Sequence, residues 1–247
     1  MDDVRIGSVP YANALPLTRG LLSVETDVPS RLAVRFRAGE FDVALLPSFE
    51  VLRLGDRPIV PAGCIASEGP VDSVLLFSRE ALREARTVRL DRSSLTSAAL
   101  TKVLFRGLFS REPEYRSGGP ETDPRHAVED AVLLIGDPAL IAPRDGLVVS
   151  DLATMWREWT GLPFCFAVWV ARDASCAARV AGPLAAARER GRLEREEVVR
   201  EAAARTGLSR ERMRRYLGER IHHEFGDRER ESLRHFGKLC RDAGLLR

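Results

Sequence analysis

Short runs of Val, Ile and Leu alternate with helix-like patterns through residues 1–172. Such alternation is typical of an α/β architecture and predicts largely parallel sheets. The predicted strands cover residues 4–9, 43–46, 60–65, 73–77, 88–90, 131–135, 147–149 and 164–171. The predicted helices among them cover residues 30–38, 48–54, 98–109 and 151–160.

The pattern changes from residue 174 onward, where strand signals vanish and helical patterns follow one another with short breaks. These helices are predicted near residues 177–190, 194–206, 209–217 and 227–243. The sequence therefore predicts an α/β body followed by a helical C-terminal extension.

No low-complexity linker divides the chain, and two crossings between lobes are predicted near residues 78–86 and 163–169. One lobe is then discontinuous, built from residues 1–80 and 170–247, and residues 81–169 form the other. Two such lobes leave a cleft between them, which is where ligands usually bind and around which lobes commonly close.

Four hydroxyl side chains cluster where the strand at 88–90 gives way to the helix at 98–109. They belong to Ser93, Ser94, Thr96 and Ser97. Unpaired amides and the positive end of the helix dipole converge at a helix N-terminus, so this segment has the chemistry of an anion site. The alternative is that one Ser caps the helix and the other hydroxyls are solvated, which is the usual fate of such residues.

Small or polar residues follow three further predicted strands in the same way. They are Pro10, Tyr11 and Asn13 after the first strand, Ser48 after the second, and Gly136 and Asp137 after the strand at 131–135. Strand ends of this kind are where α/β proteins place their ligand sites. The prolines at positions 10 and 16 restrict the backbone around Asn13, which favours a pre-organised group, whereas a helix cap is the commoner role of Asn.

The turn at residues 67–73 contains Gly69, whose amide could reach a ligand, although a purely structural turn is the favoured interpretation. An aromatic-rich stretch follows later in the chain, at residues 156–169. Core packing is the default for these rings, and one of them could wall the cleft.

Composition narrows the function classes. The chain has 247 residues, 45% of them hydrophobic, and a formal net charge of +2, so no strong field favours nucleic acid or an anionic membrane. Its four cysteines form no C-x-x-C pair, which predicts free thiols and no zinc motif. An acidic start without a secretory pattern, and the lack of a long apolar run, predict a soluble cytoplasmic protein.

Residues 198–217 form a rival signal, because they have helix-turn-helix spacing with Gly207 at the turn and several arginines on the second helix. This spacing suggests a DNA-binding regulator. The alternative is an αα-hairpin packed on a lobe, and Glu211 and Glu219 weaken the case for binding in a DNA groove.

Several segments across nearly the whole chain occur together in a specific order. They are residues 5–17, 39–48, 69–74, 91–97, 134–140, 151–156 and 160–164. In this combination the chain resembles the menaquinone-biosynthesis family of the futalosine route, and specifically its chorismate dehydratases. The resemblance implies a two-lobed α/β fold similar to the type II periplasmic solute-binding proteins, with an interlobe cleft and a helical C-terminal extension, used here by a cytoplasmic enzyme.

The resemblance also implies a hydro-lyase that converts chorismate to 3-[(1-carboxyvinyl)oxy]benzoate without a metal, a redox cofactor or a covalent nucleophile. We expect Asn13 to be catalytic, through a hydrogen bond to the departing hydroxyl or the enolpyruvyl group. The two carboxylates of the substrate are expected at the hydroxyl-rich segment. The expected substrate-binding residues are Pro10, Tyr11, Ser48, Gly69, Ser93, Ser94, Thr96, Ser97, Gly136 and Asp137. No side chain stands out as the general base, and a substrate carboxylate could fill that role.

Two alternatives stay open beside this hypothesis. A sister enzyme that makes 1,4-dihydroxy-6-naphthoate shares the implied fold and is expected to use a cleft histidine, but the four histidines here lie at position 126 and in the helical tail. A non-catalytic solute-binding protein for small anions is the second alternative. We expect a small dicarboxylate as the partner, neither nucleic acid nor membrane, and we leave a homodimer open.

Overall fold

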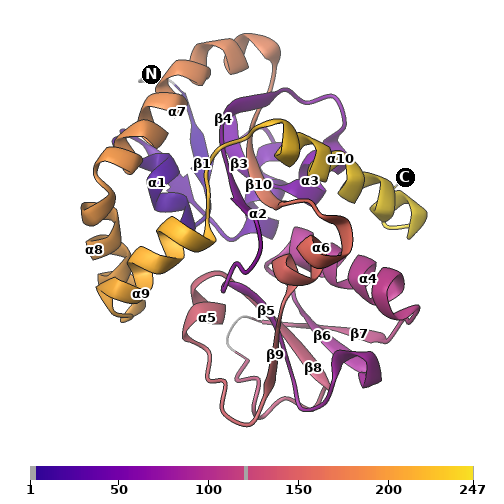
Figure 1. Ribbon diagram of the computed structural model, residues 1–247. Helices are drawn as coiled ribbons and strands as arrows, with labels where there is room; N and C mark the ends of the chain where they lie inside the picture. The colour runs from indigo at the N-terminus through magenta and orange to yellow at the C-terminus, as the bar shows by residue number, and fades with distance from the viewer. Residues whose placement is uncertain (1–3, 120–121, 247) are drawn as a thin grey trace.

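Two sheets form the body of the molecule in the computed structural model, which describes residues 4–119 and 122–246 (Figure 1). The strands of the first sheet are β1 (Ile6–Ser8), β2 (Val24–Thr26), β3 (Val43–Pro47), β4 (Ile59–Ser67) and β10 (Phe164–Ala171), in the order β2-β1-β3-β10-β4. The strands of the second sheet are β5 (Val74–Ser78), β6 (Thr87–Asp91), β7 (Glu114–Gly118), β8 (Ala131–Ile135) and β9 (Val148–Asp151), in the order β7-β6-β8-β5-β9. The two-lobed α/β architecture is confirmed.

Helices surround these sheets and continue into the C-terminal extension. Those of the body are η1 (Ala12–Ala14), α1 (Leu15–Thr18), α2 (Pro29–Arg37), α3 (Ser48–Leu54), η2 (Leu82–Glu84), α4 (Leu95–Phe109), α5 (Gly136–Ile141) and α6 (Leu152–Thr160). Those of the extension are α7 (Ala174–Leu193), α8 (Arg195–Thr206), α9 (Arg210–Arg215), η3 (Tyr216–Arg220) and α10 (Asp227–Asp242).

The sheets are mixed, which corrects the expectation of largely parallel sheets. β1 runs parallel to β2 and β3, and β6 runs parallel to β7 and β8. β10 and β5 are antiparallel to both of their neighbours. The reason is the path of the chain: each of these two strands begins where the chain has just crossed between lobes, so it must run away from the junction toward which the parallel strands point.

The crossings lie elsewhere than the sequence predicted. β5 belongs to the second sheet, so the first crossing falls in residues 68–73 and not in 78–86. β10 belongs to the first sheet over its whole length, so the return crossing falls before Phe164. The predicted boundaries at residues 80 and 170 were therefore wrong, because apolar runs show where strands are and not which sheet they join.

The helical extension packs along the body. α7 packs on β4 and α1, and α10 contacts β10, α3 and α4. Figure 1 shows α7, α8 and α9 as an arc that descends from the first sheet toward α5 of the second lobe. No helix in the described part of the chain is long and apolar enough to span a membrane.

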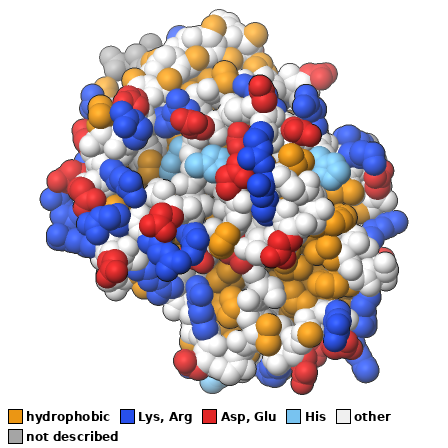
Figure 2. All heavy atoms as spheres, viewed as in Figure 1, with side chains coloured by type: hydrophobic (Ala, Val, Ile, Leu, Met, Phe, Trp, Pro, Cys, Tyr) orange, Lys and Arg blue, Asp and Glu red, His pale blue; other side chains and the backbone are white. Residues whose placement is uncertain are grey.

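The rival helix-turn-helix segment is a hairpin in which three arginines are paired with glutamates. The Arg214 guanidinium lies 2.7 Å from the Glu196 carboxylate, Arg200 pairs with Glu197, and Arg215 lies 3.7 Å from Glu219. Figure 2 shows blue and red side chains intermixed over this region. Neutralised pairs of this kind favour a solvated hairpin over a surface that binds the phosphates of DNA.

We predict that Gly191→Ala destabilises the protein by about 1–3 kcal/mol, the usual cost of overpacking. Gly191 lies where α7 meets α1, and a Cβ there would come within 2.1 Å of the Pro16 carbonyl oxygen. Gly182, in the same helix, has nothing within 4 Å of such a Cβ. Urea unfolding of Gly191→Ala and the control Gly182→Ala tests this, and equal stabilities would contradict the proposed contact.

Candidate active site

A cavity lies at the junction of the two lobes, lined by residues from both sheets. Its apolar wall includes Val9, Ile65, Val74, Ile135 and Phe166, and its polar wall includes Tyr11, Asn13, Ser73, Ser94, Thr96 and Ser97. A few polar groups in an apolar cleft are the usual composition of a small-molecule site. The volume is about 60 Å³, enough for only a few water molecules. The structure is therefore in a closed arrangement, and a ligand with a six-membered ring requires the lobes to move apart.

Asn13 supplies an unpaired polar atom to this cavity. The residue is 8% exposed, and its Oδ1 is buried without a hydrogen-bond partner. Leaving a buried acceptor unpaired costs about 1–3 kcal/mol, so such atoms are rare unless a ligand completes them. Asn13 is also the only Asn in a chain that contains no Gln. The lone side-chain amide of the protein thus faces the cleft.

The backbone around Asn13 is fixed from two directions. The amide of Ala12 donates to Asp137 Oδ1 of the opposite lobe at 3.0 Å, and burial raises the pKa of that carboxyl. The carbonyl oxygen of Asn13 lies 2.9 Å from His223 Nε2. The short helix η1 is therefore held in place by its neighbours.

Most hydroxyl side chains of the hydroxyl-rich segment are already hydrogen-bonded to other protein groups. Ser94 is the N-cap of α4 and accepts from the amide of Ser97 at 3.1 Å, as the alternative interpretation held for one Ser. The Ser93 hydroxyl donates to Asp91 Oδ1 at 2.6 Å, and Thr96 Oγ1 accepts from the amide of Phe49 in the other lobe at 3.1 Å.

At this end of α4, the groups available to bind an anion are mainly backbone amides. Within the described residues, the amides of Leu95 and Thr96 donate to no protein acceptor. They are the first two amides of α4, where a helix leaves donors unpaired and the dipole favours negative charge. The lining residues include no Lys, Arg or His, so an anion in the described cavity is bound by neutral donors.

Six of the predicted site residues line the cavity together: Tyr11, Asn13, Ser94, Thr96, Ser97 and Gly136. Gly136 has a φ of +63°, and a Cβ there would lie 2.7 Å from the Tyr11 ring of the other lobe. A glycine is therefore needed for the lobes to approach this closely.

The other predicted residues lie outside the lining of this cavity, and their role in substrate binding stays a prediction. The Ser48 hydroxyl donates to the carbonyl of Cys165 at 2.7 Å, and Gly69 is in a turn closed by the Ser67 hydroxyl at 2.8 Å. The Pro10 carbonyl accepts from Arg205. Ser93 and Asp137 bind protein groups, as described above. The polar atoms of these residues thus have partners within the fold.

Three residues that the sequence did not single out contribute to the site. Ser73, in the first crossing, lines the cavity, and its hydroxyl accepts from the buried Tyr216 hydroxyl at 2.8 Å. Tyr216 and His223 both come from the helical extension. No local motif marks these contacts, because they join residues 143 and 210 positions apart.

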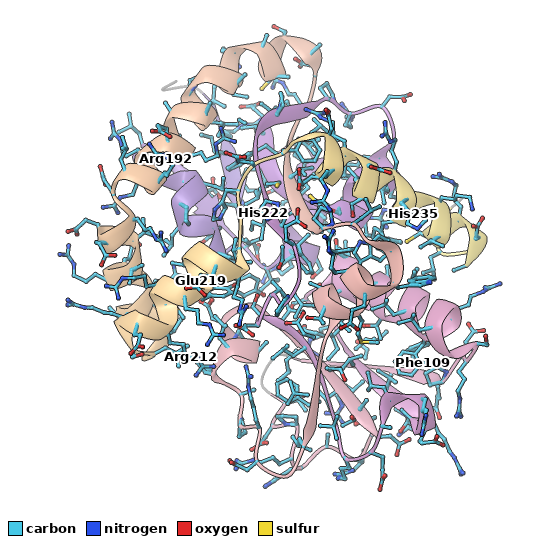
Figure 3. The ribbon with its side chains drawn as sticks, viewed as in Figure 1. Phe109, Arg192, Arg212, Glu219, His222 and His235 are labelled. Carbon is cyan, nitrogen blue, oxygen red and sulfur yellow. The ribbon has the colours of Figure 1, made fainter. Side chains whose placement is uncertain are left out.

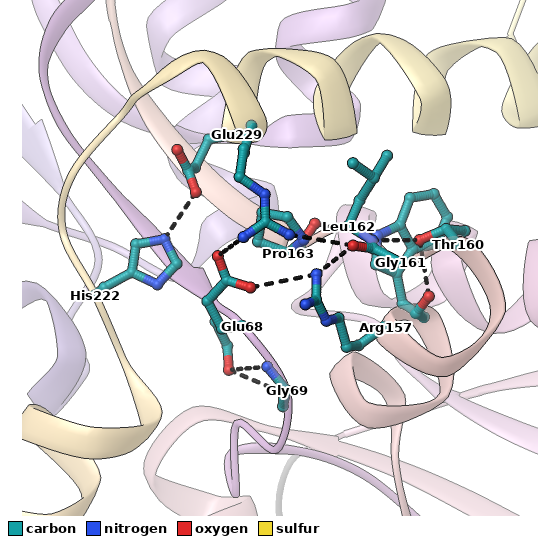
Figure 4. A network of polar contacts seen from close by, with 12 residues as sticks. Glu68, Gly69, Arg157, Thr160, Gly161, Leu162, Pro163, His222 and Glu229 are labelled. Carbon is teal, nitrogen blue, oxygen red and sulfur yellow. Dashed lines mark hydrogen bonds and ion pairs between the residues drawn. The ribbon is translucent and has the colours of Figure 1, made fainter.

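Charged groups of the extension also reach both crossings. Glu68, in the first crossing, lies 2.6 Å from Arg228 of α10 and 3.4 Å from Arg157 of α6, and both arginines contact the Gly161 carbonyl (Figure 4). Arg212 of α9 donates to the Leu140 carbonyl of α5 at 2.5 Å, and Figure 3 shows it beside the second lobe. The extension therefore ties the two lobes together.

No three or more His, Cys, Asp or Glu side chains in the described residues are grouped so that they could hold a metal ion. The four cysteines are buried and unbridged.

Comparison with known proteins now adds to this geometry. Residues 4–242 match the model of a family described as menaquinone biosynthesis. The chain belongs to the menaquinone biosynthesis family. A relative from Thermus thermophilus, named chorismate dehydratase, is 34% identical over 249 residues, covering 90% of each chain. A chorismate dehydratase from Campylobacter jejuni is 26% identical over 255 residues, covering 97% of this chain and 98% of the relative.

Solved structures show the fold of this menaquinone biosynthesis family member. Protein AF1704 from Archaeoglobus fulgidus has a TM-score of 0.80 at 16% identity, with 98% of each chain covered. The periplasmic aliphatic sulphonate binding protein SsuA from Escherichia coli has a TM-score of 0.64 at 17% identity, covering 98% of this chain and 88% of that protein. The expected fold, similar to that of periplasmic binding proteins, is confirmed.

His223 predicts a pH dependence of stability. Desolvation lowers its pKa from 6.5 to about 4, although the hydrogen bond to the Asn13 carbonyl raises it, and the positive charge of Arg188 acts in the same direction as desolvation. The unfolded chain then binds a proton at this residue below about pH 6.5, while the folded chain does so only near pH 4. The stability contributed by neutral His223 is therefore lost as pH falls through this window.

We expect the unfolding free energy of His223→Gln to fall less than that of the native chain between pH 6.5 and 4. Urea unfolding across this range measures the difference. His222→Gln is the matched control, because its ring faces Glu229 and not Asn13. Parallel pH curves for the native chain and His223→Gln would contradict a lowered pKa at His223.

Proposed function

We propose that the protein removes water from chorismate to give 3-[(1-carboxyvinyl)oxy]benzoate, as a hydro-lyase of the futalosine route to menaquinone. The unpaired Asn13 Oδ1 in the interlobe cavity is the observation that carries the proposal. The family assignment supports it, and so do the names of the two relatives.

The cavity suits each requirement of the reaction. The apolar wall formed by Ile135, Phe166 and Val74 fits a six-membered ring, and the N-terminus of α4 fits a carboxylate. Burial raises the pKa of Tyr11 to about 12, so its hydroxyl stays protonated and can donate to the substrate. Closure of the lobes excludes water and fixes the substrate relative to Asn13.

The elimination breaks the ring C–O bond and a neighbouring ring C–H bond, and it forms the double bond that makes the ring aromatic. The hydroxyl and the proton leave together as water. In our proposal Asn13 Oδ1 accepts a hydrogen bond from the ring hydroxyl and orients it. The lining residues in the described cavity include no carboxylate, imidazole or amine. We therefore propose that a carboxylate of the substrate takes the ring proton and passes it to the departing hydroxyl, so that water leaves and the carboxylate is ionised again.

The two alternatives are less well supported. Both named relatives are chorismate dehydratases, and no histidine lines the described cavity as the naphthoate synthase hypothesis requires. The solute-binding hypothesis rests on the shared fold alone. The cytoplasmic location and the homodimer stay predictions.

Incubation of the purified protein with chorismate should give a product lighter by one water, formed faster than in a protein-free control, because the cleft aligns the groups that leave. Mass spectrometry of the reaction mixture measures this. Chorismate binding without conversion would support the solute-binding alternative and contradict the enzyme.

Asn13→Ala should lower kcat by about 100-fold or more, the cost of losing one oriented polar group at a reacting centre. The free energy of unfolding should change by less than about 1 kcal/mol or increase, because the variant removes a buried unpaired acceptor. Steady-state kinetics and urea unfolding measure the two quantities. A loss of stability that accounts for the lost turnover would show that Asn13 is structural.

A further inference from the structure

The C-terminal extension reaches the backbone of Asn13, which lines the cavity, through a short extended segment after η3. This segment pairs with the edge of the first sheet: His222 and Ala66 exchange backbone hydrogen bonds of 2.9 and 3.1 Å, and the amide of Cys64 donates to the His223 carbonyl at 3.2 Å. Neighbouring side chains of an extended segment point in opposite directions. The His222 ring accordingly faces Glu229 at 3.1 Å (Figure 4), while the His223 ring faces the Asn13 carbonyl at 2.9 Å.

His223 can act only as a hydrogen-bond donor toward the Asn13 carbonyl. A carbonyl oxygen accepts, so His223 Nε2 carries the hydrogen and donates. The neutral ring, favoured at pH 7, is sufficient for this bond. His223 therefore fixes the backbone of Asn13 by hydrogen bonding and takes no part in proton transfer.

Tyr216 holds the side chain of Ser73 on the cavity wall. Its side chain is 2% exposed, and its hydroxyl donates to Ser73 Oγ at 2.8 Å. Asn13 Oδ1, on the same wall of the cavity as Ser73, has no hydrogen-bond partner in the described residues.

In the hydrogen bond between Tyr216 and Ser73, Tyr216 is the donor and Ser73 is the acceptor. The single phenolic hydrogen of Tyr216 goes to Ser73 Oγ. Ser73 then accepts from Tyr216, and in the described residues its own hydroxyl hydrogen has no protein acceptor. The wall therefore presents an acceptor, Asn13 Oδ1, and a donor, the Ser73 hydroxyl, to the same cavity.

We propose that Tyr216 and His223 of the helical extension are positioning residues, which hold Asn13 as an acceptor and Ser73 as a donor toward the substrate. The inference rests on the proposed function. A departing hydroxyl oxygen gains charge as its C–O bond breaks, and a pre-oriented donor such as Ser73 stabilises that charge. The extension thus builds part of the active site.

The test compares kcat and KM for chorismate in Tyr216→Phe and in the matched control Tyr115→Phe, which removes a hydroxyl on β7, outside the cavity lining. Tyr216→Phe should lower kcat by about 10- to 100-fold, the usual cost of misplacing a reacting group, with KM changed by less than about threefold. Tyr115→Phe should match the native chain. Equal kcat values in the two variants would overturn the role of Tyr216.

If Tyr216→Phe does not fold, variants of His223 test the positioning role of the extension instead. His223→Leu should lower kcat, and His223→Gln should restore most of it, because the Gln amide keeps a donor for the Asn13 carbonyl. His222→Leu and His222→Gln are the controls, since His222 faces Glu229. A His223→Gln variant no more active than His223→Leu, or a kcat loss matched by the folded fraction measured by circular dichroism, would refute positioning. An inactive native chain would instead refute the proposed function.

Discussion

Both sheets point the carboxyl ends of their parallel strands at a single junction, and this constraint determines where most of the candidate residues lie. β1 ends shortly before Asn13, β8 ends at Ile135 just before Gly136, and β6 leads into the N-terminus of α4. The junction also contains both crossings of the chain. Small changes at the crossings therefore change the distance between the two walls of the cavity. A ligand that contacts both lobes stabilises the closed form, because it binds that form more tightly than the open one.

Hydrogen bonds between the lobes hold the closed form. A bound substrate must either replace these hydrogen bonds or leave them in place. The Ala12 amide binds Asp137, the Phe49 amide binds Thr96, and the Ser30 amide donates to the Ser93 carbonyl at 3.0 Å. These are few and local, so opening costs little compared with unfolding a lobe. The helical extension contacts both lobes and links lobe geometry to Asn13.

Much of the body could be predicted from the sequence. The buried strands β3, β8 and β10 are continuous apolar runs, and their predicted ranges lie within one residue of the observed ones. β2 and β7 were not predicted, because they are short, largely exposed edge strands with little apolar signal. The sheet that each strand joins could not be predicted from local pattern, and the boundaries of the lobes were wrong for that reason.

The candidate site was predictable in part. Strand ends and a hydroxyl-rich helix start indicate the cleft, and the single side-chain amide of the chain marks Asn13. Which hydroxyls face the cavity depends on partners across the junction, such as the Phe49 amide for Thr96. Tyr216 and His223 carry no local signal at all, because only the packing of the extension against β4 brings them to Asn13.

The central claim is that chorismate reacts between Asn13 and the N-terminus of α4. A crystal structure of the protein with bound 3-[(1-carboxyvinyl)oxy]benzoate tests it most directly. The account predicts the ring against Phe166 and Ile135, a carboxylate at the Leu95 and Thr96 amides, and Asn13 Oδ1 facing the ring carbon that lost its hydroxyl. A product bound outside the interlobe cavity, or with both carboxylates away from α4, would contradict it.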